Sequence, residues 1–262
     1  MTGWELGLVG LAALVIGISK TSVGGFAAMA VAVFATVLPA KESTAAVLLL
    51  LITGDVVGVA RYRRSADWGL LRRLLPSVLP GVALGAVFMW AVSDLALRRT
   101  IGGLIAAMVL VQVWQRWRSR RVAGEAAAAR AEVGAEVGVA VGRAEHPLVA
   151  VAAGVAAGFT TMTANAAGAV MTLYLLAMRV EKLRFIGTSA WFFLIVNVSK
   201  VPFSAGLGLF HAESLRLVAM LVPVVLVGTW LGVLLIRRLS QVTFERVALA
   251  GSAVAAVALL VR

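Results

Sequence analysis

Two short polar stretches inside long apolar segments hold the residues best suited to binding a ligand. Residues 17–25 hold Lys20 among glycines and hydroxyl-bearing side chains, and residues 158–165 hold three threonines and Asn165. Ammonium and hydroxyl groups donate hydrogen bonds, and neither stretch contains a carboxylate. A pocket between the stretches would therefore be rich in donors and would suit a small oxyanion. The candidate substrate-binding residues are Ser19, Lys20, Thr21, Ser22, Gly24, Gly25, Thr160, Thr161, Thr163 and Asn165.

Asp55, Asn197 and Lys200 also interrupt apolar sequence, and they could couple transport or support the pocket. An ionisable group inside a membrane is costly and usually faces a cavity or a partner. Plainer structural interpretations stay open beside this one. Lys20 could pair with Asp55, Lys200 could extend its ammonium to the membrane surface, and Asn197 could join two helices. Each hydroxyl could bond only to a carbonyl of the preceding helical turn.

Long apolar blocks make up most of the chain. Hydrophobic residues account for 61% of its 262 residues and charged residues for 14%. A soluble domain has roughly 45–50% apolar residues and about 25% charged residues. Because lipid cannot satisfy backbone polar groups, such blocks predict helices. We predict an all-α, polytopic transmembrane helical bundle in the bacterial cytoplasmic membrane. The apolar blocks cover residues 6–38, 44–60, 74–92, 101–115, 147–178, 186–203, 215–236 and 247–261.

Residue types that serve catalysis are scarce. The chain has no cysteine and two histidines, which excludes thiol chemistry and argues against a histidine-based metal site. No nucleophile elbow and no phosphate-binding loop is present in the sequence. We therefore predict a protein that is not an enzyme and that needs neither a metal nor another cofactor.

The formal net charge of +12 comes from arginines that cluster between the apolar blocks. Examples are the runs at residues 61–64, 72–73, 116–121 and 237–238. Arginine-rich short loops are typical of the cytoplasmic side of membrane proteins. The charge therefore indicates topology and contact with the lipid bilayer, and we expect no nucleic-acid partner.

A glycine pattern recurs in the two halves of the chain. Pro-x4-Gly-x3-Gly begins at Pro76 and again at Pro223, 147 residues later, and upstream Gly17 matches Gly158 at an offset of 141. Glycines four residues apart let helices approach closely, and internal duplication is common in secondary transporters. The predicted domains are a first transmembrane repeat, a cytoplasmic linker and a second transmembrane repeat, at residues 1–115, 116–146 and 147–262.

The first block of each half is too long for one straight crossing. Residues 6–38 and 147–178 would each extend roughly 48 Å at 1.5 Å per residue, against a hydrocarbon core of about 30 Å. The polar stretch within each block predicts a break between two half-helices. A single crossing by each block would make the halves parallel and place the basic residues of the second half outside. A re-entrant hairpin would invert the halves and place these residues inside, as the charge rule prefers, so we predict inverted repeats and leave the single crossing open.

Several short motifs give the chain a family resemblance. In the first half they are Gly17-Ile18-Ser19-Lys20-Thr21 with Gly24-Gly25, Gly54-Asp55, Arg61-Tyr62-Arg63-Arg64 and Asp67-Trp68. In the second half they are Ala164-Asn165-Ala166-Ala167-Gly168, Gly187-Thr188-Ser189-Ala190-Trp191, and Asn197 with Lys200-Val201-Pro202. On these motifs the chain resembles the TauE/SafE sulfite-exporter-like family, also called TSUP, over nearly its whole length except residues 116–146. The family pattern has a proline after Asn-Ala-Ala-Gly, where this chain has Ala169.

The resemblance implies transport of sulfite, thiosulfate, sulfoacetate or other sulfonates, in a direction that it does not settle. We predict a secondary transporter of small sulfur-containing oxyanions or organosulfonates that works by alternating access around a midplane site. The sequence leaves open whether protons are the coupling ion and whether the protein forms a homodimer. Two alternatives remain. A non-transporting scaffold or sensor would act through residues 116–146, and an anion channel would need a continuous polar path.

Overall fold

The computed structural model describes residues 1–21, 27–125, 147–178 and 180–235. These residues form α-helices and one short 3-10 helix, with no strand in the described ranges. Five of the helices are long and apolar enough to cross a membrane. The elements are α1 (Gly3–Thr21), α2 (Ala27–Val37), α3 (Ala40–Tyr62), η1 (Arg63–Ser65), α4 (Trp68–Ala91), α5 (Asp94–Glu125), α7 (Pro147–Ala164), α8 (Ala167–Ala177), α9 (Lys182–Gly206) and α10 (Ala212–Leu235).

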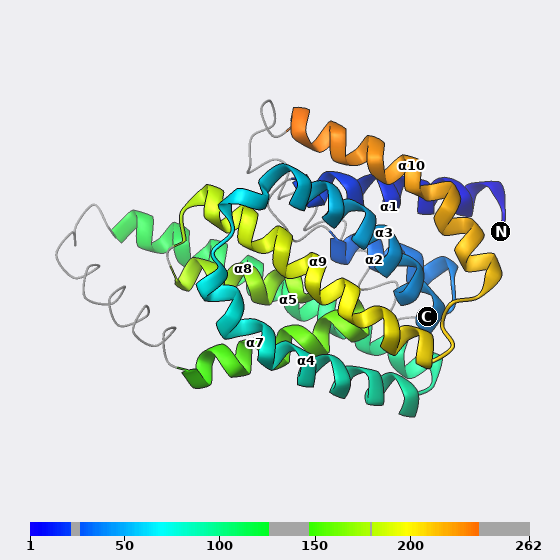
Figure 1. The fold of residues 1–262 in the computed structure, drawn as a ribbon, viewed down its shortest axis with the longest axis horizontal. Helices are drawn as coiled ribbons and strands as arrows, with labels where there is room; N and C mark the ends of the chain where they lie inside the picture. The colour runs from blue at the N-terminus through cyan, green and yellow to red at the C-terminus, as the bar shows by residue number, and fades with distance from the viewer. Residues whose placement is uncertain (22–26, 126–146, 179, 236–262) are drawn as a thin grey trace.

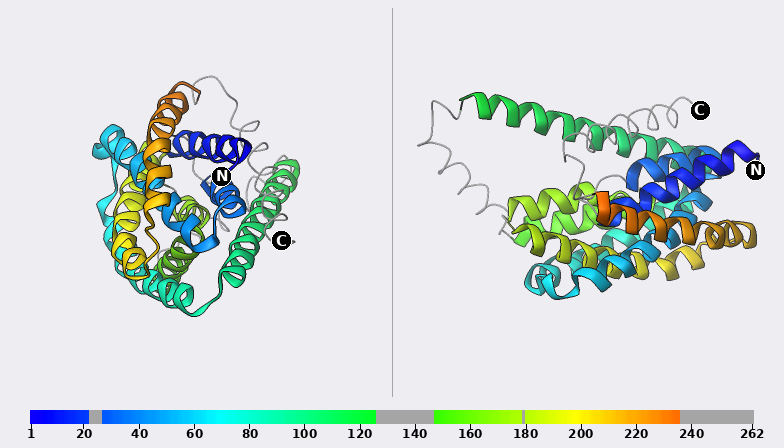
Figure 2. Two further views of the ribbon diagram at one scale, coloured as in Figure 1. Left: turned by 90° about the vertical axis from the view of Figure 1, so that its right-hand side faces the viewer. Right: turned by 90° about the horizontal axis from the view of Figure 1, so that it is seen from above.

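The helices are arranged in neighbouring pairs drawn from both halves of the chain. In Figure 1, α1 and α10 lie side by side along the top of the bundle, and α4 and α7 lie along the bottom. Helices α3 and α9 pack against each other between these pairs, and α5 runs along one side, as Figure 2 shows. The strongest contacts therefore join the first half of the sequence to the second.

Glycine makes two of these pairings possible. A Cβ atom on Gly17 of α1 would lie 2.7 Å from the backbone nitrogen of Thr229 on α10. A Cβ atom on Gly158 of α7 would lie 2.8 Å from the backbone nitrogen of Val82 on α4. The two contacts are related by the sequence offsets of 141 and 147 residues, so the repeated motifs make equivalent helix contacts.

This packing predicts that alanine is not tolerated at Gly17. We expect Gly17→Ala to lower the free energy of unfolding by about 1–3 kcal/mol, because the added methyl group would meet backbone that cannot rotate away. The matched control is Gly10→Ala on the same helix, where nothing lies within 4 Å of the added carbon. Unfolding in mixed detergent micelles measures both variants. Equal stability of the two would show that α1 and α10 do not approach as closely as described here.

The first block of each half holds two described helices. The break predicted in the first block falls on residues 22–26, between α1 and α2, which lie outside the described ranges, whereas α7 and α8 are separated at residues 165–166. In Figure 1, α1 runs inward from the N-terminus and α2 runs back toward the same side. Helix α8 likewise runs back along the direction from which α7 came. The second break forms although Ala169 replaces the proline of the family pattern.

Two predicted segments lie partly or wholly outside the described residues. Helix α5 continues to Glu125, so the first ten residues of the predicted linker 116–146 are helical. The remainder of that linker, and the predicted apolar block at residues 247–261, lie outside the described ranges.

Aspartates cap two of the helices that meet at the ends of the bundle. Asp94 of α5 accepts hydrogen bonds of 3.0 Å from the backbone nitrogens of both Ala40 and Lys41 at the start of α3. Asp67 accepts from the backbone nitrogen of Leu70 at 3.2 Å and so caps α4. These side chains satisfy helix-terminal N–H groups that have no partner within their own helix. The caps fix where α3 and α4 begin.

Candidate functional site

Lys200 of α9 lies at the centre of a buried polar network. Lys200 is only 1% exposed. Its Nζ donates hydrogen bonds to Thr161 Oγ1 at 3.3 Å and to Asn197 Oδ1 at 3.4 Å. Nζ also donates to Asn165 Oδ1. All three acceptors are neutral oxygens. The interpretation that Lys200 extends to the membrane surface is wrong, because its ammonium is enclosed among α7, α9 and the second break.

Asp55 of α3 lies beside this lysine and is already engaged through both carboxylate oxygens. Its Oδ1 is 2.6 Å from Nζ of Lys20, and its Oδ2 accepts from Nδ2 of Asn197 at 2.7 Å. The Lys20 ammonium also lies 4.8 Å from the centre of the Phe193 ring, within reach of a cation–π interaction. The pairing of Lys20 with Asp55 that the sequence left open is present in the structure.

Glycine at position 54 makes room for the Lys20 side chain. A Cβ atom on Gly54 would lie 2.7 Å from Cγ of Lys20, so any other residue there would displace the lysine stem. Lys20 is in the last turn of α1, where its positive charge also interacts favourably with the helix dipole. The Gly54-Asp55 pair therefore provides both the space and the counter-ion for Lys20.

Asn165 joins the second break to α3 and α9. It ends α7 with a positive φ of 49°, a conformation that asparagine tolerates better than most residues. Its Nδ2 donates to the backbone oxygen of Thr44 on α3 at 3.0 Å, while its Oδ1 accepts from Lys200. The amide is therefore held in one orientation by a fixed acceptor on one side and a fixed donor on the other.

The charged groups in this network do not cancel. Lys20 and Asp55 form an ion pair, whereas no carboxylate in the described part of the chain forms a salt bridge with Lys200. Two ammonium groups and one carboxylate give a formal charge of +1 in a buried site. A buried charge without a counter-ion is strongly unfavourable, so the network is suited to receive one negative charge.

Six of the predicted site residues meet in one network, and others do not join it. Lys20, Asp55, Thr161, Asn165, Asn197 and Lys200 are linked by the contacts above. Three predicted hydroxyls instead donate to carbonyls of their own helices, at 2.8, 2.7 and 2.9 Å: Ser19 to Ile16, Thr160 to Ala156 and Thr163 to Phe159.

Some predicted positions lie beyond what the structure describes. Ser22, Gly24 and Gly25 lie outside the described ranges, and Thr21 is described through its backbone only. Sequence reasoning did not place Phe193 or the Thr44 carbonyl in the site. Phe193 lies in an apolar segment where an aromatic residue looks like any other packing residue, and a backbone carbonyl leaves no signal in the sequence. Within the described ranges, no three His, Asp or Glu side chains lie close enough together to hold a metal ion.

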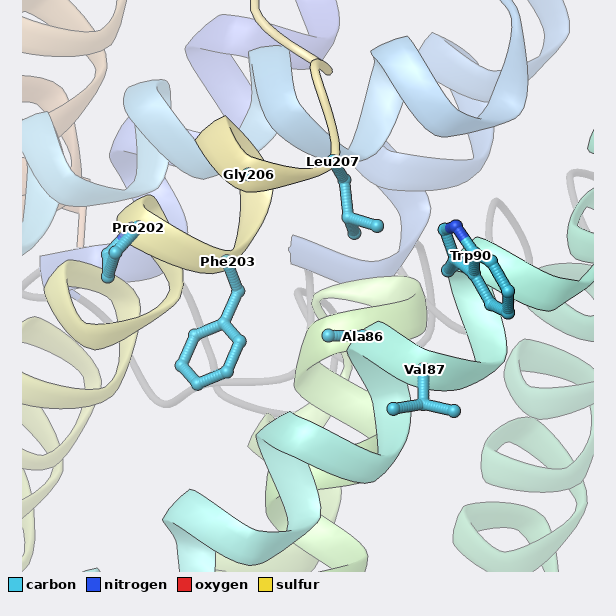
Figure 3. Close-up of a pocket in the computed structure, with 7 residues that line it drawn as sticks. All are labelled: Ala86, Val87, Trp90, Pro202, Phe203, Gly206 and Leu207. Atoms are coloured by element: carbon cyan, nitrogen blue, oxygen red, sulfur yellow. The ribbon is translucent and has the colours of Figure 1, made fainter.

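A separate apolar cavity lies between the ends of α4 and α9. It has a volume of 490 Å³, and Figure 3 shows the side chains around it. None of the described residues that line it is charged. The cavity is therefore unsuited to an anion and is distinct from the polar network. The lining residues are Ala86, Val87, Trp90, Pro202, Phe203, Gly206 and Leu207.

A family comparison accounts for nearly the whole chain. The model of the family described as "Sulfite exporter TauE/SafE" matches residues 9–259. The chain belongs to the TauE/SafE family. Membership, together with the five long apolar helices, makes it a multi-pass membrane protein of the sulfite exporter type, in a family of transporters and not of enzymes. Searches of curated proteins and of solved structures find no match.

Proposed function

We propose that this TauE/SafE protein is a secondary transporter of small sulfur-containing oxyanions or organosulfonates, of the sulfite, thiosulfate or sulfoacetate type. The observation that supports this most strongly is the buried ammonium of Lys200, whose hydrogen-bond partners among the described residues are all neutral oxygens. A bound oxyanion would replace one of these neutral acceptors by a charged one. The ammonium would then gain a Coulomb attraction to an opposite charge, which a neutral oxygen cannot supply.

The second break supplies further donors beside Lys200. Helix α8 begins at Ala167, two residues after Asn165, and the first N–H groups of a helix have no partner within it. A helix N-terminus favours negative charge through both these groups and the helix dipole. We assign Lys200, Asn165 and Thr161 as the primary anion-binding residues, and Lys20 with Asp55 as the neighbouring ion pair.

The arrangement of the helices favours inverted halves. Helices α3 and α9 run antiparallel, because Asp55 bonds to Asn197 while Gly58, further along α3, lies near Ala190, earlier on α9. These two helices occupy corresponding places in the halves, which an inverted repeat requires to run in opposite directions. We propose that α1 with α2, and α7 with α8, form re-entrant hairpins, and that one half rocks against the other around a midplane site.

This topology in the bacterial cytoplasmic membrane predicts that both termini lie outside. A tag fused to the C-terminus should therefore react with an impermeant label in intact cells. Labelling only after the membrane is opened would contradict the inverted arrangement.

Uptake by the purified protein tests the proposed function. Proteoliposomes should take up labelled sulfite or isethionate, a monovalent sulfonate, faster than protein-free vesicles of the same lipid. Labelled glucose serves as the matched neutral solute and should enter both kinds of vesicle at the same rate. Equal entry of the anions into both vesicles would refute transport.

A further inference from the structure

The charge of the buried network suggests how transport is coupled to an energy source. We propose that Lys200 carries the coupling proton, so that one proton crosses the membrane with each monovalent anion. This inference rests on the proposed function and deepens it. Of the three residues that the sequence offered as possible coupling groups, Asp55, Asn197 and Lys200, it assigns the role to Lys200.

The surroundings of Asp55 make it a poor proton carrier. Its Oδ1 is held by Lys20 at 2.6 Å and its Oδ2 by Asn197 at 2.7 Å, so both oxygens already accept from donors. Protonating Asp55 would leave Lys20 without its counter-ion in an environment where it is only 10% exposed. The pair Lys20–Asp55 is therefore a fixed neutral unit, and the remaining charge is on Lys200.

Among the described residues, the charged groups that act on Lys200 are the two members of the ion pair, Lys20 from α1 and Asp55 from α3. Helix α7 presents the hydroxyl of Thr161, and the second break presents the amide of Asn165.

The arginines of η1 and α4 lie elsewhere. Element η1, which contains Arg63 and Arg64, meets α9 at Gly187, well before Lys200 in the helix. Arg72 and Arg73 are exposed near the start of α4, whereas the part of α4 near Pro202 is the apolar stretch around Ala86. Within the described residues, the extra positive charge of Lys200 is therefore removed either by loss of its proton or by binding of an anion.

The network can reach a net charge of zero in two ways. Either Lys200 holds a proton and an anion is bound beside it, or Lys200 is a neutral amine and no anion is bound. The states with only one of the two partners leave an uncompensated charge in a buried site, which is strongly unfavourable. Proton and anion therefore bind together, and by linkage each raises the affinity for the other.

The coupled step is a simple protonation. The lone pair of the Lys200 amine takes a proton from water on one side, the anion binds to the resulting ammonium, and both leave on the other side as the ammonium returns its proton to water. No other bond forms or breaks. The cycle moves no net charge for a monovalent oxyanion, so the membrane potential should not drive it, whereas a pH gradient should.

The test uses wild-type proteoliposomes containing a trapped pH-sensitive dye. Labelled isethionate or sulfite is added outside, and valinomycin with a potassium gradient sets the membrane potential. We expect the interior to acidify by one proton per isethionate taken up, with a rate that is unchanged when the potential is reversed. Isethionate uptake without acidification, at a rate that follows the potential, would overturn the inference while leaving the proposed function intact. No uptake of either anion would overturn the proposed function, and the inference with it.

Lys200→Arg separates anion binding from proton release. A guanidinium stays protonated at any accessible pH, so the variant can bind an anion but cannot give up its proton. We expect isethionate still to raise the thermal stability of the variant, because a ligand that binds the folded state stabilises it, whereas net pH-driven uptake should fall about tenfold or more because the guanidinium keeps its proton. Net uptake that acidifies the interior as in wild type would assign the proton to another group and overturn the inference. The wild-type measurement decides the question even if this variant does not fold.

Discussion

Replacing Lys200 with Gln is expected to lower uptake of sulfite and sulfonates about 100-fold, because one charged hydrogen bond to a bound anion contributes about 3 kcal/mol. Glutamine can still donate to the Asn165 oxygen, so the neutral hydrogen bonds around position 200 can be kept. The buried positive charge is lost, and with it the attraction for an anion. Uptake into proteoliposomes measures the effect.

The stability of this variant gives an independent second readout. Because the coupling scheme makes Lys200 a neutral amine when no anion is bound, the variant is expected to keep the wild-type free energy of unfolding in anion-free buffer. A residue that only stabilised the fold would instead lose stability and uptake together. The matched control is Ser199→Ala on the same helix, whose hydroxyl only donates to the Val196 carbonyl at 2.8 Å. Uptake by Lys200→Gln within threefold of the control would exclude Lys200 from the site.

The second large effect is a loss of folding stability, expected when Asp55 is replaced. Asp55→Asn should lower the free energy of unfolding by about 3–5 kcal/mol, because it leaves the Lys20 ammonium buried without its counter-ion. Both side chains are well enclosed, with Asp55 1% and Lys20 10% exposed, so solvent screens the pair little. Unfolding in mixed detergent micelles measures the loss.

The double variant Lys20→Met/Asp55→Asn isolates the pair itself. Removing both charges should recover most of the stability lost by Asp55→Asn alone, since no uncompensated charge then remains. A double variant as unstable as the sum of the two single variants would show that the ion pair does not act as a unit. Its uptake decides the role of Lys20. Uptake near wild type would make the pair structural, and loss of uptake in a stable double variant would place Lys20 in the binding site.

The packing of the helices could be predicted from the sequence better than the polar site. Glycines repeated at fixed offsets predict close contact, and Gly17 and Gly158 do meet backbone of α10 and α4. The reason is physical, because few arrangements other than close packing use a row of glycines on a membrane helix. The separation of α7 from α8 likewise lies in an apolar block that is too long for one straight crossing.

The partners of each polar side chain could not be predicted. Any hydroxyl on a helix can reach a carbonyl of the preceding turn, so Thr160 and Thr161 look alike in the sequence. Only the approach of α9 gives Thr161 a contact with Lys200, and that contact spans 39 residues. For the same reason, the sequence left two interpretations of Lys200 open, a role in the polar site and extension to the membrane surface. Its spacing fits a lysine near a membrane surface, and only the tertiary fold encloses it.

Counterflow in proteoliposomes tests the central claim of a carrier with an anion site most directly. Vesicles are loaded with unlabelled sulfite, diluted into a trace of labelled sulfite, and sampled over time. A carrier that alternates access predicts a transient accumulation of label above its final level, since unlabelled anion leaving the vesicle returns the site to bind label outside. Entry of label to its final level without an overshoot would indicate a channel. Entry no faster than into protein-free vesicles would indicate a scaffold or sensor, and either result would contradict the mechanism proposed here.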